Sequence, residues 1–295
     1  MNTVLAELGR KYAERWVTLL LLPGTLYVAG TAAACRLGHT HWADPGRLTA
    51  LTERGGPIGG RTVSSVWLLA VVVLPVLSAA AGLAARGAAA ALGRLWFDPW
   101  PRALDRPARR LTAARAARWE AAEAEYRAEL EGPAVPDRLD ALAARRNAVA
   151  LVPPRRPTWC GDRLRAVDAR VWGWYRLDVV FGWPRLWLVL LPAEQEALRA
   201  ARTELDAAVA LCGWGVLTLL PALCWWPATA VAAGLFAVGL RRTRAAVDTV
   251  AHLTEAAFDL RGALLARRLG FDVPARSRLT PQVGARVTAH LRKHA

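Results

Sequence analysis

The chain has 295 residues, of which 54% are hydrophobic and 21% are charged, and its formal net charge is +15. The apolar share exceeds that of an ordinary soluble domain while the charged share is normal, so the two kinds of residue must be segregated along the chain. Long uncharged runs and arginine clusters at their ends favour a membrane protein with basic cytoplasmic segments, and they exclude nucleic acid as the expected partner.

Residues 1–15 form the first predicted element, a helix with Val4, Leu5, Leu8 and Tyr12 at helical spacing. A basic start followed by an apolar stretch also fits a signal peptide, which is the alternative. Because this start is long for a signal peptide, we expect an amphipathic helix on the inner face of the membrane.

Residues 16–93 predict transmembrane helices 1 and 2, joined by an extracytoplasmic loop over 36–61. The runs 16–35 and 62–85 contain no charged residue. Since about 20 apolar residues span the hydrocarbon core of a bilayer, each run predicts one crossing.

The outer loop contains two patterns that resemble sites. The sequence GGPIGGRT at 55–62 resembles a phosphate-binding loop, but no strand precedes it and a predicted crossing follows. His39, His41 and Asp44 lie close together, yet histidines two residues apart point to opposite sides of a strand and do not converge on a helix. We therefore expect neither a cofactor nor a metal here.

Residues 94–206 predict a helical cytoplasmic domain, because no run of alternating β-branched residues indicates a strand. The stretch 111–131 is rich in Ala, Arg and Glu and ends before Gly132 and Pro133, which predicts a solvated helix or one arm of a helical hairpin. A second helix is expected over 137–150, ending at a cluster of prolines: Pro153, Pro154 and Pro157.

Residues 158–192, here called the Trp/Arg segment, contain five tryptophans interleaved with arginines. Its apolar part, 179–192, is too short to cross a membrane and includes Arg185, so it is re-entrant, interfacial or part of the domain core. Trp and Arg together favour the headgroup layer of a bilayer, and a Trp-rich protein core is the alternative. The candidate site for anionic headgroups comprises Trp172, Trp174, Arg176, Trp183, Arg185 and Trp187.

Residues 207–240 are uncharged and too long for one crossing. The Trp-Trp-Pro sequence at 225–227 predicts a helix break, giving a hairpin of transmembrane helices 3 and 4 at about 207–223 and 228–240. The flanking helices should continue out of the membrane as rods.

Residues 241–295 predict cytoplasmic C-terminal helices. Thr280 and Pro281 have the pattern of a helix N-cap followed by the first helical residue, and they predict a short final helix. In the longer helix before it, a heptad-like spacing predicts a seam that packs on the preceding helix or forms a coiled coil; its members are Val250, Leu253, Ala257, Leu260 and Leu264.

The basic residues orient these predicted crossings. Arginines and one lysine precede helix 1, and further arginines follow helices 2 and 4. By the positive-inside rule, both termini and the 94–206 domain lie in the cytoplasm, and the expected location is a bacterial cytoplasmic membrane.

Three stretches resemble an uncharacterised family of actinobacterial multi-pass membrane proteins. They are PTWCGDRLRA at 157–166, YRLD at 175–178 and WPRLWLVLLP at 183–192. The resemblance covers about 157–270. It implies a bacterial source and a multi-pass topology, and it implies no catalytic residues.

No pattern in the sequence indicates catalysis. The cysteines form no CxxC, the serines lie in no GxSxG frame, and the predicted crossings contain no ionisable residue that would carry ions or protons. The prediction is therefore a non-enzymatic, all-α membrane protein of about four crossings. It would act as a scaffold or signalling component that docks a protein partner or forms homo-oligomers. The alternative is an oligomeric channel or a membrane-perturbing, pore-forming effector.

Overall fold

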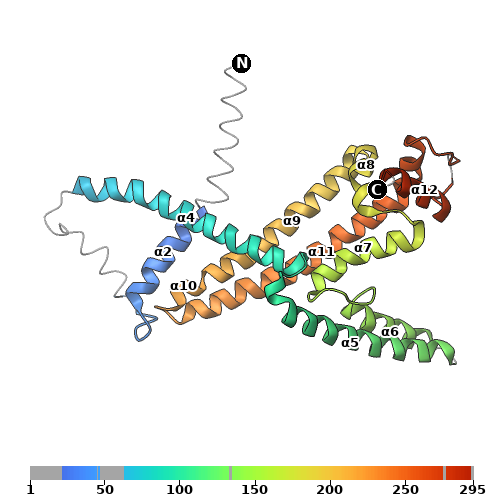
Figure 1. Cartoon of the computed structure of the whole chain (residues 1–295). Helices are drawn as coiled ribbons and strands as arrows, with labels where there is room; N and C mark the ends of the chain where they lie inside the picture. Colours follow the sequence, from blue (N-terminus) through green and yellow to red (C-terminus); the bar gives the residue numbers. More distant parts are fainter. Residues whose placement is uncertain (1–21, 45, 47–62, 133–134, 275–276, 294–295) are drawn as a thin grey trace, which may run out of the picture. The chain divides into compact units, whose positions relative to one another are not determined.

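The computed structural model describes residues 22–44, 46, 63–132, 135–274 and 277–293, with backbone only over 63–71. Every regular element in these ranges is helical (Figure 1), which confirms the predicted all-α class. The predicted helix 1–15 and the GGPIGGRT sequence at 55–62 lie outside the described residues.

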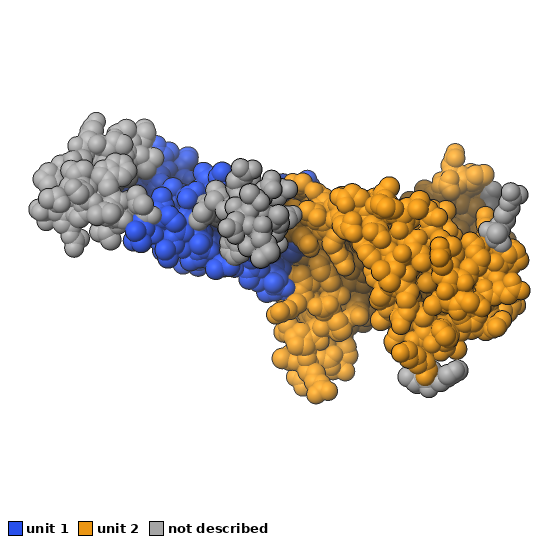
Figure 2. All heavy atoms as spheres, turned by 90° about the horizontal axis from the view of Figure 1, so that it is seen from above, with its two compact units in different colours: residues 1–92, 208–241 blue, residues 93–207, 242–295 orange. Residues whose placement is uncertain are grey.

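The chain forms two compact units (Figure 2). Unit 1 comprises residues 1–92 and 208–241, and unit 2 comprises residues 93–207 and 242–295. Three helices contribute residues to both units: α4 (Val63–Phe97), α9 (Pro192–Leu217) and α11 (Pro227–Arg268).

Unit 1 contains α2 (Leu22–Leu37) and the short α10 (Leu219–Ala222), with its share of the three long helices. Its helices approach so closely at three glycines that a side chain would not fit. A Cβ atom on Gly24 would lie 2.2 Å from the Ser78 carbonyl oxygen, and one on Gly213 would lie 2.3 Å from the Ala85 carbonyl oxygen. On Gly239, it would lie 2.5 Å from a sulfur, the Sγ atom of Cys212.

Among the described residues, two helices are long and apolar enough to cross a membrane, Val72–Phe97 and Pro192–Ala222. Only 28% of the apolar window of the first and 39% of that of the second are buried inside the protein, whereas a core helix of a soluble protein is mostly buried. Large apolar side chains on unit 1 are instead exposed, among them Leu26, Val76 and Leu223. These two helices support membrane association.

The predicted helix break at 225–227 is found, because α10 ends at Ala222 and α11 begins at Pro227. The helices that flank the apolar run are also continuous with it, as predicted. Residues 192–206 belong to the same helix as the start of the apolar run, and α11 continues without interruption to Arg268.

In unit 2, the 3-10 turn Arg102–Leu104 leads into α5 (Asp105–Glu131), and α6 (Pro136–Val149) packs along α5. The Arg146 Nη1 atom lies 2.9 Å from the Glu123 Oε2 atom across this pair. The predicted hairpin arm is therefore a true helical hairpin, and its first helix begins earlier than the sequence indicated.

The core of unit 2 is built by α7 (Trp159–Tyr175), α8 (Val179–Val189), α12 (Pro281–Leu291) and the adjoining part of α11. As predicted, α12 begins after Thr280, whose side chain accepts a hydrogen bond from the Val283 amide. The largest fully buried side chains include Leu186, Phe258, Leu265 and Val287.

The predicted seam on α11 is wrong at one position. Leu260 is 73% exposed, and the face of α11 that is buried in the core carries Ala251, Phe258 and Leu265. Each of these residues is one position after a predicted seam residue, so the buried face is displaced from the seam. The helix packs against α7, α8 and α9 and not against one parallel partner.

Candidate functional site in the Trp/Arg segment

A buried carboxylate anchors the beginning of α7. Asp162 is 1% exposed, and its Oδ1 atom accepts hydrogen bonds from the Arg155 amide at 2.8 Å and the Arg156 amide at 3.0 Å. Its Oδ2 atom lies 3.0 Å from Arg115 Nη2 on α5. These bonds fix the proline-rich connection and the α5–α6 hairpin to α7.

The next residue, Arg163, ties α7 to α11. It is 3% exposed, and its guanidinium donates to Asp248 at 2.6 Å and to Glu255 at 3.0 Å. Glu255 also pairs with Arg170 at 3.0 Å. Arginines at the start of the Trp/Arg segment are therefore held by ion pairs inside unit 2.

The turn between α7 and α8 is held in an unusual conformation. Arg176 ends α7 with φ 53°, a left-handed conformation that usually favours glycine, and its carbonyl accepts a hydrogen bond from Thr288 Oγ1 at 2.9 Å. The guanidinium carbons of Arg176 and Arg292 lie 5.7 and 5.8 Å from the Trp172 ring centroid. Trp174, two residues further along α7, is 71% exposed.

One face of α8 packs on the core of unit 2. Gly182 and Leu186 are buried, and Trp183 lies 6.2 Å from Phe258, measured between ring centroids. Arg185 is half-buried, and its Nη1 atom donates to the Phe181 carbonyl oxygen at 2.8 Å.

The opposite face of α8 is apolar and exposed. Three side chains of this face, together with Leu191 just after the end of the helix, are here called the α8 stripe. They are accessible to solvent over 42–80% of their surface: Val180, Phe181, Leu188 and Leu191. The sequence did not single them out, because α8 is apolar on all sides and its inner and outer faces have the same composition. A helix that is apolar all round is normally covered on both faces. The composition of α8 was therefore the one signal in the sequence that its outer face needs a partner.

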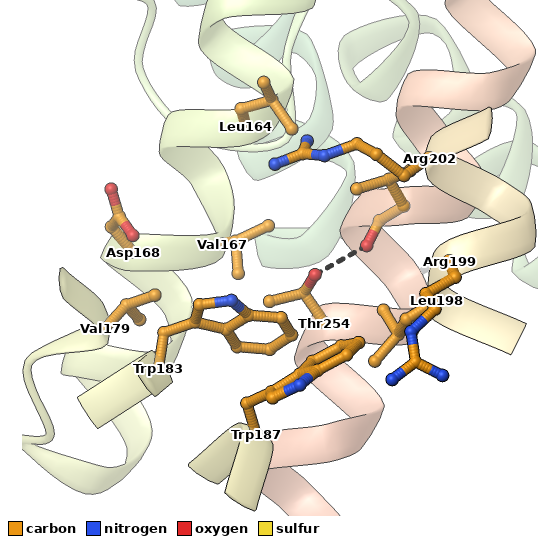
Figure 3. A pocket seen from close by; sticks show the side chains of 11 residues that line it. Leu164, Val167, Asp168, Val179, Trp183, Trp187, Leu198, Arg199, Arg202 and Thr254 are labelled. Carbon is orange, nitrogen blue, oxygen red and sulfur yellow. Dashed lines mark hydrogen bonds between the residues drawn. The ribbon is translucent and has the colours of Figure 1, made fainter. Parts of the chain in front are cut away.

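A cavity of about 380 Å³ lies on the inner side of α8, lined by residues of α7, α8, α9 and α11. Figure 3 shows the Trp183 and Trp187 indoles in its wall, with Thr254 of α11 near them. Thr254 Oγ1 donates to the Val250 carbonyl oxygen at 2.7 Å and so is already engaged within its own helix.

Charged groups stand on opposite sides of this cavity (Figure 3). Arg199 and Arg202 of α9 lie on one side, and Asp168 of α7 lies on the other. The guanidinium carbon of Arg199 is 5.3 Å from the Trp187 ring centroid. Although Asp168 is exposed as a whole residue, burial of its carboxyl against the cavity wall raises its pKa above the usual aspartate range, and the Asp178 charge adds to this. The cavity thus combines aromatic walls with separated charges.

The six predicted headgroup residues therefore lie in different surroundings. Trp172, Trp174 and Arg176 lie at the end of α7 and are exposed, whereas Trp183 and Trp187 are partly buried against the core and line the cavity. The segment thus contains an exposed aromatic and basic cluster at the end of α7 and tryptophans packed on the protein core in α8. Their binding of headgroups stays a prediction.

The histidines of the predicted outer loop have separate partners. His39 Nε2 lies 3.0 Å from the Leu223 carbonyl oxygen, His41 Nδ1 lies 2.8 Å from Thr40 Oγ1, and Asp44 accepts from the Gly46 amide at 2.9 Å. Within the described ranges, no three His, Cys, Asp or Glu side chains form a group that could hold a metal ion. Comparison of the chain with protein-family models, curated proteins and solved structures finds no match.

Proposed function

We propose that this chain is a non-catalytic protein of a bacterial cytoplasmic membrane that crosses the bilayer four times and docks a protein partner on the cytoplasmic side. Unit 1 provides the anchor, and unit 2 provides the docking surface through the α8 stripe. The resemblance of 157–270 to an actinobacterial membrane-protein family is consistent with this proposal.

Four crossings are supported by more than the two helices of sufficient length. Exposed apolar side chains also occur on α2 and on the first part of α11, as expected of helices that face lipid; they are Leu22, Leu26, Val231 and Val238. By the positive-inside rule, the run of arginines after α4 and the Arg241–Arg242 pair on α11 support a cytoplasmic unit 2.

The α8 stripe is the observation that carries the docking function. Exposed contiguous apolar patches are uncommon on soluble surfaces and mark sites of interaction with proteins or membranes. A short apolar helix face fits the groove or helix of a partner, as in recognition of amphipathic helices.

The charges near the stripe favour a protein over a lipid surface. Helices that lie on anionic membranes combine an apolar face with free Lys or Arg at its edges. The one arginine on α8, Arg185, donates to the Phe181 carbonyl, so α8 itself carries no row of free cations beside the stripe.

The pore alternative has less support. A pore needs polar groups along one side of an assembled ring. The described helices of unit 1 instead expose large apolar side chains, among them Leu26, Val76 and Leu223.

The test is crosslinking of the full chain in its native membrane. A photoreactive amino acid at Leu188 should crosslink to a protein, while the same residue at Arg127, which is exposed on α5, should not. The Leu188→Glu substitution should lower crosslinking from a photoreactive residue at Val180 by about tenfold or more, because burying an unpaired carboxylate costs well over 1.4 kcal/mol. Crosslinks to lipid alone would favour headgroup docking instead. If neither the Leu188 nor the Val180 position gave a crosslink, the docking function would be contradicted.

A further inference from the structure

Within unit 1, the end of α2 lies against the turn that joins α10 to α11. Two polar contacts hold the two segments together. His39 Nε2 lies 3.0 Å from the Leu223 carbonyl, and Trp225 Nε1 donates to the Trp42 carbonyl at 3.0 Å. Earlier in α2, Tyr27 donates to the carbonyl of Leu217, the last residue of α9, at 3.1 Å. The Trp42 and Trp226 rings add an edge-to-face contact with centroids 5.4 Å apart.

Two cysteines lie inside this contact. Cys35 is one helical turn before His39, and Cys224 stands between Leu223 and Trp225, so each is next to a residue that bonds across the two segments. The two thiols are close enough to interact. Cys35 is exposed and Cys224 is half-buried, so an external thiol reagent or oxidant can reach the pair.

The surroundings fix the two backbones relative to each other. A disulfide forms without strain only where two cysteines approach closely with a suitable direction of their side chains. The contacts on both sides of the pair hold it close, and the bond would close a loop containing most of the chain, the arrangement in which a crosslink restricts the unfolded chain most.

We propose that Cys35 and Cys224 form a disulfide that joins α2 to the tip of the α10–α11 hairpin on the extracytoplasmic side. This inference depends on the proposed topology, which places both residues outside the cytoplasm, where disulfides persist. The two thiols lose two protons and two electrons as the S–S bond forms. The disulfide of a thiol–disulfide oxidoreductase accepts them and is reduced to a dithiol.

The other two cysteines provide controls. Cys160 is buried at the start of α7 in unit 2, and Cys212 is buried in α9 beside Gly239. Substituting either one by serine should leave the proposed bond intact.

The experiment determines the redox state of the full chain in cells. Cells are quenched with acid, and free thiols, including the buried ones of Cys160 and Cys212, are blocked with an alkylating agent on the denatured protein. The protein is then reduced and labelled with a maleimide mass tag. We expect two tags on the natural chain and on the Cys160→Ser and Cys212→Ser variants, and none on Cys35→Ser or Cys224→Ser. An untagged natural chain, or a crosslinked dimer on a non-reducing gel, would overturn the proposal.

A second arm separates the causes of failure. Purified protein is incubated with oxidised glutathione and tested for the intramolecular bond. If the bond forms there but not in cells, the pair is close and the predicted outer location of the turn is wrong. If it forms in neither, the contact itself is wrong. The crosslinking test at Leu188 depends on neither result, so the docking function is judged separately.

Discussion

Single residues in the Trp/Arg segment have roles that the sequence could not separate. Asp162 and Arg163 are adjacent in the chain, both are buried, and each binds groups from a different part of unit 2. A sequence identifies such residues as charged and therefore as exposed, because burial of a charge depends on partners that are distant along the chain. The proximity of Cys35 and Cys224 was not predictable either, because the two residues are distant along the chain.

Removal of the Asp162 carboxylate should destabilise unit 2. The Asp162→Ala substitution leaves the Arg155 and Arg156 amides and one Arg115 nitrogen without their acceptor. We expect the free energy of unfolding to fall by about 3 kcal/mol, the usual cost of breaking a buried ion pair by removing one partner. Denaturant unfolding of the purified protein, followed by circular dichroism, measures this.

The matched control is Arg109→Ala, which removes an ion pair with Asp105 whose two side chains are 72% and 55% exposed. Exposed pairs contribute little, so the change should stay within about 0.5 kcal/mol. Equal effects of the two substitutions would show that the buried network around Asp162 does not stabilise the fold.

The ends of individual helices were predicted well where a local sequence signal marks them. Gly132 follows α5, Pro136 starts α6, and Thr280 with Pro281 starts α12, each by a residue whose backbone preference acts locally. The faces of α8 and α11 were not predictable in this way. Both helices pack against several neighbours, so which side is buried is decided by residues far away in the chain, as the exposure of Leu260 illustrates.

The α5–α6 hairpin should lose stability in acid. The hydrogen bond from Arg146 is the main cause that lowers the pKa of Glu123 below its ordinary value of 4.5. A lowered carboxyl pKa contributes stability that is present above the ordinary value and is lost as the pH falls through the folded-state value. The Glu123→Gln variant should therefore show a smaller drop in unfolding temperature than the natural chain between about pH 6 and about pH 3.

Glu125→Gln serves as the control for this series, because its ion pair with Arg145 lies on the surface, with side chains 47% and 68% exposed. It should follow the natural chain through the acid range. If Glu123→Gln did so too, the Glu123–Arg146 pair would not contribute to the stability of the hairpin.

At the scale of the whole molecule, the predicted topology depends on two simple quantities in the sequence, the length of uncharged runs and the position of arginines. Two of the expected crossings are found as helices of sufficient length and hydropathy among the described residues. The other two depend on shorter apolar stretches of α2 and α11. Their assignment therefore depends on the charge pattern and on exposed apolar side chains.

Labelling of single cysteines in intact cells tests the four-crossing topology most directly. In a chain without its natural cysteines, a membrane-impermeant maleimide should label Thr40→Cys without permeabilisation. It should label Arg127→Cys and Ser277→Cys only after the membrane is opened. All three positions are exposed, so access to the reagent depends on the side of the membrane. Labelling of Arg127→Cys in intact cells, or protection of Thr40→Cys, would contradict a cytoplasmic unit 2 anchored by four crossings.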